Sequence, residues 1–256
     1  MIDIRNITAA YGDKKVLKNL AIRIEEGECA ALIGANGAGK TTLLKAISGA
    51  LKTSGKILID GRSVRRMPCR KRAEILSVVP QNPDANTPLT GYDFVMLGRT
   101  HLIPRFSSPS VEDCRAVENA MQRTSTLFLK KRFLKKMSGG ERQRLALAMA
   151  FAAHSRIILL DEATAHLDLH HRAEIMRLLR TVNHQKNVTI VMAVHDLSLA
   201  SRYFGRLILL KEGRVLCDGS PDAVLTEKNI KDAYGCAVRV VKLPESLGSA
   251  VVPVDT

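Results

Sequence analysis

The chain has 256 residues, of which 46% are apolar and 25% charged, a balance typical of a globular protein built around one main core. No stretch approaches the roughly 20 apolar residues that span a bilayer, and no basic segment followed by an apolar one opens the chain, so neither a membrane-spanning subunit nor a secretory signal is expected. The net charge of +14 would attract polyanions without choosing among them. Five cysteines without a CxxC pair argue against a disulfide scaffold and a zinc cluster.

Short apolar runs alternate with longer segments of helical periodicity along the chain, which predicts an α/β fold with a largely parallel sheet. In the first part we expect strands at 2–7, 20–24, 29–33 and 57–59, and a helix at 40–48. From about residue 81 to 136 the strand pattern fades, prolines interrupt the chain, and residues 111–121 show helical spacing. This stretch is predicted to be a mainly helical insert.

The second half returns to alternating helices and strands. We expect a helix rich in small residues at 142–153, a buried strand at 156–160, and another buried strand at 188–194. Between the two strands, Asp168 is a candidate cap for an amphipathic helix. Its apolar positions recur at helical period: Ile175, Leu178, Leu179 and Val182.

A glycine-rich loop lies between the predicted strand at 29–33 and the predicted helix at 40–48. It fits the phosphate-binding pattern GxxxxGK[ST] in the strand–helix context that the motif requires: Gly34-Ala35-Asn36-Gly37-Ala38-Gly39-Lys40-Thr41. Glycines let backbone N–H groups point inward, and the helix directs its positive end at the same place. We expect Lys40 to reach the β- and γ-phosphates and the Thr41 hydroxyl to ligate Mg²⁺. The pattern arises by chance in roughly 1% of chains of this length, so it predicts nucleotide binding.

Two acidic residues, Asp161 and Glu162, follow the predicted strand at 156–160. A strand that runs out into solvent can also end in charge, but carboxylates at a buried strand end need partners. With a phosphate loop upstream, Mg²⁺ is the expected partner of Asp161, held directly or through water. Glu162 is then placed to accept a proton from the attacking water.

One further motif specifies the kind of nucleotide-binding protein: Met137-Ser138-Gly139-Gly140-Glu141-Arg142-Gln143-Arg144. Here the chain resembles the ABC ATPase family, whose signature is LSGGQ or LSGGE followed by RQR. Ser138 and Glu141 also form the pattern of a helix capping box. A cap does not explain Gly139 and Gly140, whose N–H groups can bind an anion at a helix N-terminus. Both interpretations can hold together.

Other positions match the family in order and spacing across nearly the whole chain. The resemblance implies that Tyr11 stacks on adenine, with an ordinary strand tyrosine as the alternative. Gln81 resembles the Q-loop glutamine, which touches Mg²⁺ or water and moves with the transmembrane partner. His195 resembles the switch histidine that contacts the γ-phosphate, and Ala165-His166-Leu167-Asp168 resembles the D-loop.

The resemblance implies the ABC ATPase fold, an α/β P-loop NTPase core with a mainly parallel sheet, an antiparallel β lobe and a helical insert. One domain would cover 1–256, with a helical subdomain at about 82–153 and a C-terminal extension at about 221–256. The implied cofactors are ATP and Mg²⁺. The residues that would bind ATP are Tyr11, Gly34, Asn36, Gly37, Gly39, Lys40, Thr41, Thr42, Ser138, Gly139, Gly140 and Asp168. The implied metal site comprises Thr41, Gln81 and Asp161, and the implied catalytic residues are Glu162, His195 and Gln81.

In that family the signature of one subunit meets the glycine loop of another, so the active unit implied is a homodimer. Ser138 and Gly140 would bind the ATP held by the partner's Lys40. Three departures from the family's pattern are Met137 for the usual Leu, Ala163 for the usual Pro after Glu162, and Ala165-His166 for the usual Ser-Ala. None removes a phosphate, metal or proton-transfer group.

Transport and work on nucleic acid are the two functions considered. The chain between Lys40 and Ser138 is too short for the coiled coils of repair ATPases, and the single set of motifs differs from ribosome-associated relatives. A P-loop kinase would leave the signature unexplained. Transport is therefore favoured, with nucleic acid not expected as a partner.

Within transporters, residues 79–101 and the tail at 225–240 resemble the importers of iron chelates, haem and cobalamin, while oxyanion importers such as those for molybdate stay open. The usual FTV before Asp93 is replaced by Leu89-Thr90-Gly91-Tyr92. The partners implied are two membrane-spanning permease subunits and, indirectly, a substrate-binding protein. The implied location is peripheral, on the cytoplasmic face of the cell membrane.

Overall fold

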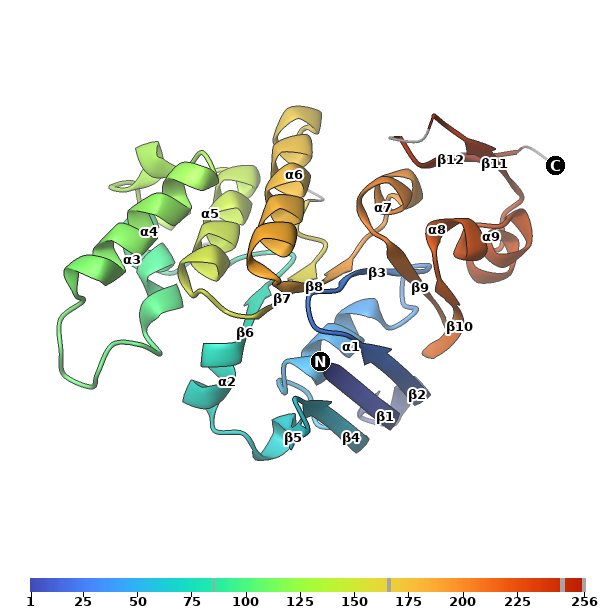
Figure 1. Cartoon of the computed structure of the whole chain (residues 1–256), viewed down its shortest axis with the longest axis horizontal. Coiled ribbons are helices and arrows are strands. Elements are labelled where there is room, and N and C mark those ends of the chain that lie inside the picture. Colours follow the sequence, from blue (N-terminus) through green and yellow to red (C-terminus); the bar gives the residue numbers. More distant parts are fainter. Residues whose placement is uncertain (85, 165–166, 245–246, 255–256) are drawn as a thin grey trace. The chain divides into compact units, whose positions relative to one another are not determined.

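The computed structural model describes residues 1–84, 86–164, 167–244 and 247–254. The chain forms two compact units, which we call unit 1 (Met1–Met67 with Thr189–Thr256) and unit 2 (Pro68–Val188). Among the described residues no helix is long and apolar enough to cross a bilayer. Figure 1 shows the elements of both units with their labels.

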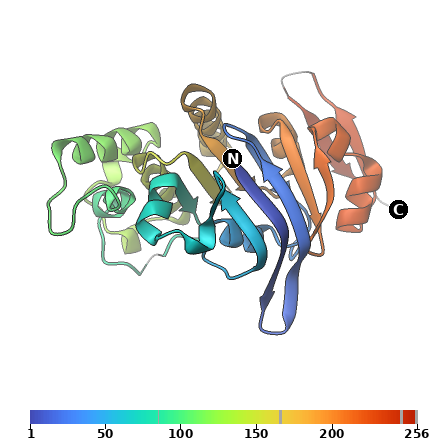
Figure 2. The ribbon, with the colours of Figure 1, turned by 60° about the horizontal axis from the view of Figure 1, so that its bottom comes forward.

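Unit 1 contains an antiparallel sheet of order β2-β1-β4-β5, in which β1 (Ile2–Tyr11) and β2 (Lys14–Ile24) form a long hairpin. β4 (Ser54–Ile59) pairs with the other edge of β1, and β5 (Arg62–Ser63) and a short 3₁₀ helix, η1 (Val64–Arg66), follow it. Figure 2 shows β1 and β2 side by side along their length. Both strands extend beyond the predicted 2–7 and 20–24, because their outer residues pair with each other across the hairpin.

The second sheet of unit 1 is mainly parallel. β3 (Cys29–Ile33) pairs in parallel with β8 (Thr189–Ala193) on one side and with β9 (Arg206–Lys211) on the other. β10 (Arg214–Gly219) adds antiparallel to β9. α1 (Lys40–Ile47) follows β3 and α7 (Leu197–Tyr203) follows β8. The central strands are buried along almost their whole length, as expected for a sheet covered on both faces.

The C-terminal part of unit 1 comprises two helices and a hairpin: α8 (Pro221–Val224), α9 (Glu227–Tyr234), β11 (Val238–Lys242) and β12 (Ser249–Pro253). The side chain of Ser201 on α7 holds the hairpin, because its hydroxyl donates to the Ser249 carbonyl at 3.0 Å and accepts from the Ser249 N–H at 2.8 Å.

Unit 2 combines helices with two parallel strands. β6 (Leu76–Val79) follows α2 (Cys69–Ile75) and pairs with β7 (Ile157–Asp161). The predicted helical insert contains α3 (Gly91–Met96), α4 (Val111–Arg123) and α5 (Gly139–Ala152), with the short 3₁₀ helices η2 (Leu97–Arg99), η3 (Leu127–Leu129) and η4 (Leu134–Lys136). α6 (Leu169–Lys186) comes after β7.

A buried ion pair joins three of the helical elements in unit 2. Arg99 Nε donates to Asp113 Oδ1 at 2.9 Å, and another nitrogen of the Arg99 guanidinium donates to the Ala152 carbonyl at 3.0 Å. Bonds from the Ser110 hydroxyl and N–H, together with Arg99, hold the pKa of Asp113 below its usual value. Thus η2, α4 and the end of α5 are fixed to one another by a satisfied charge pair.

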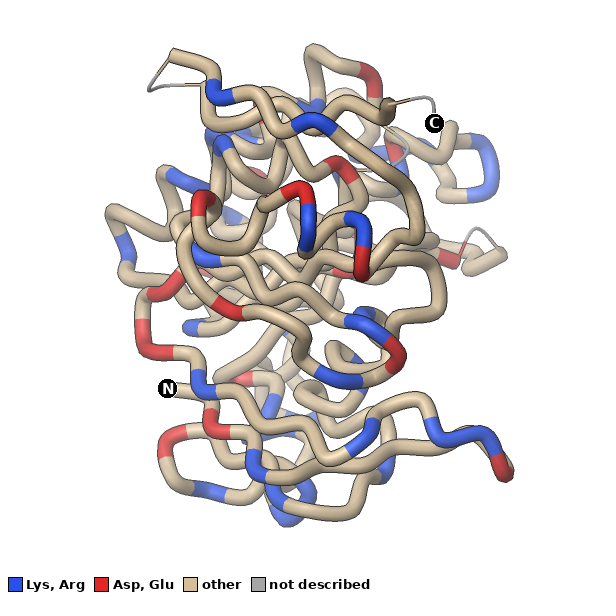
Figure 3. Tube along the Cα trace, turned by 90° about the vertical axis from the view of Figure 1, so that its right-hand side faces the viewer, with Lys and Arg blue, Asp and Glu red and all other residues tan. Residues whose placement is uncertain are grey.

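Charged residues are distributed over many elements. Figure 3 shows Lys and Arg segments with Asp and Glu segments between them, so the view displays no single basic stripe. The net charge of +14 therefore does not by itself identify a polyanion-binding surface.

Candidate functional site

The glycine-rich loop joins β3 to α1 in unit 1. Neighbouring atoms and the backbone conformation leave no room for a side chain at its first and last glycines. Gly34 has φ +144° and Gly39 has φ +107°, backbone values that residues with side chains rarely adopt. A Cβ on Gly34 would lie 2.3 Å from the Leu210 carbonyl oxygen, and one on Gly39 would lie 2.8 Å from Leu17 Cδ2. The loop therefore packs its backbone directly against β9 and β2.

Lys40 lies at the start of α1 and folds back over the loop. Its side chain is 5% exposed, and Nζ donates to the Gly34 carbonyl at 2.7 Å and to the Ala35 carbonyl at 3.2 Å. Gly39 is the N-cap of α1 and brings no side-chain cap. The first N–H groups of the helix therefore have no competing side-chain acceptor at Gly39 and point where an anion would bind.

His195 leaves the same edge of the sheet as the glycine loop. β3 and β8 are parallel neighbours, and the Val194 N–H donates to the Leu32 carbonyl at 3.0 Å, so the carboxyl ends of both strands meet there. His195 is exposed. Tyr11, the last residue of β1, is 46% exposed. Unit 1 thus brings the loop and His195 together at one sheet edge and leaves the Tyr11 ring accessible for stacking.

In unit 2 the structure brings two predicted catalytic residues into contact. β6 and β7 are parallel, and Gln81 and Glu162 follow their carboxyl ends. Gln81 Nε2 donates to Glu162 Oε2. Glu162 has φ +50°, an uncommon value for a residue with a side chain, and Asp161 beside it is buried, at 8% exposed. The acidic pair therefore occupies a constrained turn rather than a strand running freely into solvent.

The signature segment forms the capping box that its sequence predicts. The Glu141 N–H donates to Ser138 Oγ at 3.2 Å, and the Ser138 N–H donates to Glu141 Oε2 at 2.7 Å. α5 therefore begins at Gly139, earlier than the predicted 142, because the two glycines lie in its first capped turn. Ser138 Oγ accepts a bond in this cap and keeps its own hydrogen for another acceptor. The second interpretation, anion binding by Gly139 and Gly140, stays a prediction.

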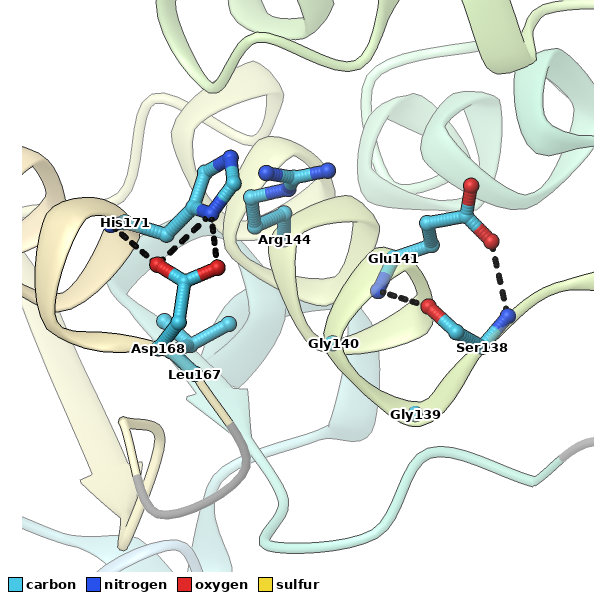
Figure 4. A pocket seen from close by; sticks show the side chains of 8 residues that line it. All are labelled: Ser138, Gly139, Gly140, Glu141, Arg144, Leu167, Asp168 and His171. Atoms are coloured by element: carbon cyan, nitrogen blue, oxygen red, sulfur yellow. Dashed lines mark hydrogen bonds and ion pairs between the residues drawn. The ribbon is translucent and has the colours of Figure 1, made fainter.

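A pocket of about 500 Å³ opens beside this cap, between the start of α5 and the start of α6. Figure 4 shows Asp168 and His171 on one side of it and the Ser138–Glu141 cap on the other. Asp168 caps α6 by accepting from the His171 N–H at 2.9 Å. This backbone bond, followed by the bond from the His171 ring, holds the pKa of Asp168 below its usual value, so the carboxylate is ionised at neutral pH.

Arg144 lines the same pocket, is 7% exposed, and has an Nε without a partner among the described residues. Sequence reasoning assigned no role to Arg144 or His171. The pattern that could have found them is local: Arg144 lies one turn after Gly140 on α5, and His171 is the third residue of the capped helix α6. Of the predicted D-loop, Leu167 and Asp168 line the pocket, whereas Ala165 and His166 lie outside the described residues.

The signature helix is also tied to the segment that leads into Gln81. Gln143, which is buried on α5, donates from Nε2 to the Pro80 carbonyl at 3.1 Å. The backbone just before Gln81 therefore cannot move without straining or breaking a bond to the helix that carries the signature.

A family model described as ABC transporter matches residues 17–165, which is more than half of the chain. The chain belongs to the ABC transporter family. Curated relatives cover nearly all of it. The hemin import ATP-binding protein of Vibrio cholerae is 36% identical, over 94% of this chain and 93% of that protein. The ferric enterobactin transport ATP-binding protein of Escherichia coli (strain K12) is 34% identical, over 96% of this chain and 92% of that protein.

Solved structures agree with this assignment. A structure reported as a metal-chelate type ABC transporter in an inward-facing conformation has a TM-score of 0.84 at 25% identity, over 100% of this chain and 98% of that chain. A bacterial ABC transporter cassette solved as a dimer has a TM-score of 0.78 at 28% identity, over 86% of this chain and 99% of that chain. The predicted family and the predicted ABC ATPase fold are confirmed.

Proposed function

We propose that this ABC-family chain is the ATP-binding subunit of an importer that couples Mg-ATP binding and hydrolysis to the uptake of an iron chelate, haem or cobalamin. The observation that carries the nucleotide part is the glycine loop, where Lys40 folds over the Gly34 and Ala35 carbonyls at the start of α1. The import part is supported by relatives that are named as hemin import and ferric enterobactin transport proteins and that match over more than nine-tenths of the chain.

The triphosphate is bound in this proposal by the glycine loop and the start of α1. Lys40 leaves the loop carbonyls to contact the β- and γ-phosphates, and backbone N–H groups of the loop bind the remaining phosphate oxygens. The accessible Tyr11 ring stacks on adenine. The residues assigned to this part are Tyr11, Gly34, Asn36, Gly37, Gly39, Lys40, Thr41 and Thr42.

The donor groups present fit Mg²⁺. This ion prefers oxygen ligands and is usually held by one or two carboxylates together with substrate phosphates. The described residues contain no cluster of three or more His, Cys, Asp or Glu side chains that would suggest a protein-only metal cage. Asp161, the Thr41 hydroxyl and the Gln81 amide are the proposed ligands. When bound, the ion neutralises phosphate charge.

Glu162 is the proposed general base. Its carboxylate accepts a hydrogen bond from the Gln81 amide, which orients the carboxylate and occupies one of its oxygens. A shift of Gln81, driven by the transmembrane partner, would release Glu162 to take a proton from the attacking water. His195 would contact the γ-phosphate from the edge of the unit 1 sheet.

The complete nucleotide site in this proposal needs a second copy of the chain. Ser138, Gly139, Gly140 and Asp168 would contact the ATP held by the partner's Lys40. The related cassette that was solved as a dimer supports this arrangement. Two membrane-spanning permease subunits, which receive cargo from a substrate-binding protein, complete the proposed transporter. The chain binds these subunits at the cytoplasmic face of the membrane.

Lys40→Ala tests the proposal, with Lys45→Ala as matched control because Lys45 is an exposed lysine on the same helix. Isothermal titration with Mg-ATP should show affinity reduced at least tenfold in Lys40→Ala and unchanged in Lys45→Ala. In a strain lacking the gene, uptake of ferric siderophore, haem or cobalamin should be restored by Lys45→Ala and not by Lys40→Ala. Equal ATP affinity in both variants would contradict the phosphate site, and loss of the gene without effect on all three cargoes would contradict the importer.

A further inference from the structure

A tyrosine from the C-terminal part of the chain contacts the first residue of the glycine loop. The backbone N–H of Gly34 donates to the hydroxyl oxygen of Tyr234 at 2.9 Å, across 200 positions of sequence. Burial raises the pKa of Tyr234 to about 12, against the opposing effect of this hydrogen bond, so the hydroxyl stays neutral at physiological pH.

The Tyr234 hydroxyl is the acceptor that the structure gives to the Gly34 N–H. The residue is buried, and the Leu210 carbonyl fills the space where a Cβ would lie, so Gly34 is closely packed. A buried N–H without a partner destabilises the conformation that buries it, which here is the start of the phosphate loop. The Tyr234 hydroxyl therefore satisfies a buried backbone group at the start of the loop.

The position of Tyr234 is determined by the C-terminal elements. Tyr234 is the last residue of α9, whose other end is capped by Thr226 and whose inner face buries Ile230 and Ala233. Gly235, at φ +74°, ends the helix directly after it. The backbone of the tyrosine is thus held by a capped, packed helix that ends directly after it.

The backbone N–H and carbonyl of Gly34 have different hydrogen-bond partners, and nucleotide binding should affect only the carbonyl's partner. Its carbonyl accepts from Lys40 Nζ at 2.7 Å. In the proposed function Lys40 gives up this contact to reach phosphate. Its N–H bond to Tyr234 does not involve Lys40 and can persist. The bond to Tyr234 therefore keeps Gly34 in place when the bond between Lys40 and the Gly34 carbonyl is lost.

We propose that Tyr234 is a positioning residue for ATP binding, through which the C-terminal part of unit 1 sets the affinity of the glycine loop for nucleotide. This inference rests on the proposed function of the loop. Tyr234 touches neither nucleotide nor metal and acts by keeping the Gly34 amide in place. It adds to the loop a determinant that lies far outside the GxxxxGK[ST] motif.

Tyr234→Phe removes the acceptor and keeps the ring, with Tyr203→Phe on α7 as the matched control. We expect Tyr234→Phe to raise KM for ATP and Kd for ATP by about 3- to 10-fold, the effect of one lost hydrogen bond. kcat at saturating ATP stays unchanged, because the catalytic groups are intact. Tyr203→Phe changes neither value. A purely structural tyrosine would instead lower the thermal midpoint and the active fraction, leaving KM as it was.

The hydrogen bond can be observed directly in the full-length chain. Ile33-Gly34 is the one Ile-Gly pair in the sequence, so ¹³C-carbonyl isoleucine with ¹⁵N-glycine isolates the Gly34 amide in the NMR spectrum. In Tyr234→Phe this amide should shift upfield and exchange with solvent faster, while Tyr203→Phe leaves it unchanged. This readout also applies if the variant is less stable, provided that its folded spectrum persists.

The outcomes separate this inference from the proposed function. A wild-type chain that binds no ATP overturns both. A wild-type chain that binds and hydrolyses ATP, with unchanged KM and an unchanged Gly34 amide in Tyr234→Phe, overturns only the role of Tyr234. A raised KM together with faster Gly34 exchange supports it.

Discussion

The contact between Gln81 and Glu162 orients the side chain of the proposed base. Gln81 follows β6 and Glu162 follows β7, and their side chains meet because the two parallel strands end at the same edge. The Gln81 amide orients the Glu162 carboxylate and occupies one of its oxygens. In the proposed mechanism, movement of Gln81 frees that oxygen for the attacking water.

We expect Glu162→Gln to slow ATP hydrolysis by ~10²–10⁴-fold, since a general base contributes about that much. ATP affinity should stay close to that of the wild-type chain, because the phosphate loop is untouched. Phosphate release measured under single-turnover conditions checks the rate, and titration calorimetry checks the affinity.

Glu174→Gln is the control for this change, since Glu174 is a carboxylate on α6 that pairs only with His170 at 3.6 Å in the described interactions. Its hydrolysis rate should equal that of the wild type. Turnover of Glu162→Gln within a few-fold of the control would remove Glu162 from the role of base.

At the scale of elements, α4 and α5 of unit 2 both begin with a serine capping box, but the two caps have different surroundings. Ser110 starts α4 and Ser138 starts α5, each with a complete capping box. The cap of α4 also engages the buried Asp113, which is paired with Arg99. The cap of α5 opens on the pocket that Asp168 and Arg144 line. The same capping box therefore contacts a buried ion pair in α4 and lines a pocket in α5.

Replacing each cap serine separates stability from function. Ser138→Ala and Ser110→Ala should each reduce the free energy of unfolding by about 1 kcal/mol, the usual cost of a lost N-cap. Only Ser138→Ala should also reduce ATPase activity at saturating ATP, because only its hydroxyl is proposed to contact the partner's nucleotide. Urea unfolding and steady-state hydrolysis are the two measurements. Equal losses of activity in both variants would indicate that Ser138 acts as a cap alone.

Local patterns predicted the elements that carry the phosphate loop. The strand at Cys29–Ile33, the loop and the start of α1 follow from an apolar run, three glycines and a lysine that are adjacent in sequence. The lengths of β1 and β2 did not follow, because their outer residues are defined by pairing with each other across the hairpin, such as Ala9 with Leu17, and show no continuous apolar run. Contacts between distant residues could not be predicted either, such as Gly34 with Tyr234 or Gln143 with Pro80.

At the scale of the whole molecule, the predicted site residues lie in both units. The glycine loop and His195 belong to unit 1, whereas Gln81, Glu162 and the signature helix belong to unit 2. Each unit thus carries residues proposed to bind ATP together with residues proposed for hydrolysis. The boundaries predicted for the helical subdomain, 82–153, and for the C-terminal extension, 221–256, stay predictions.

The most direct test of the central claim is the mass of the Glu162→Gln chain in solution with and without Mg-ATP. Because ATP is proposed to bridge the glycine loop of one copy and the signature of its twin, light scattering should show a monomer without nucleotide and a dimer with Mg-ATP. Adding Lys40→Ala or Ser138→Ala to the same background should abolish the dimer, while adding Lys45→Ala should preserve it. A chain that binds ATP yet stays monomeric, or that dimerises regardless of Ser138, would contradict the account.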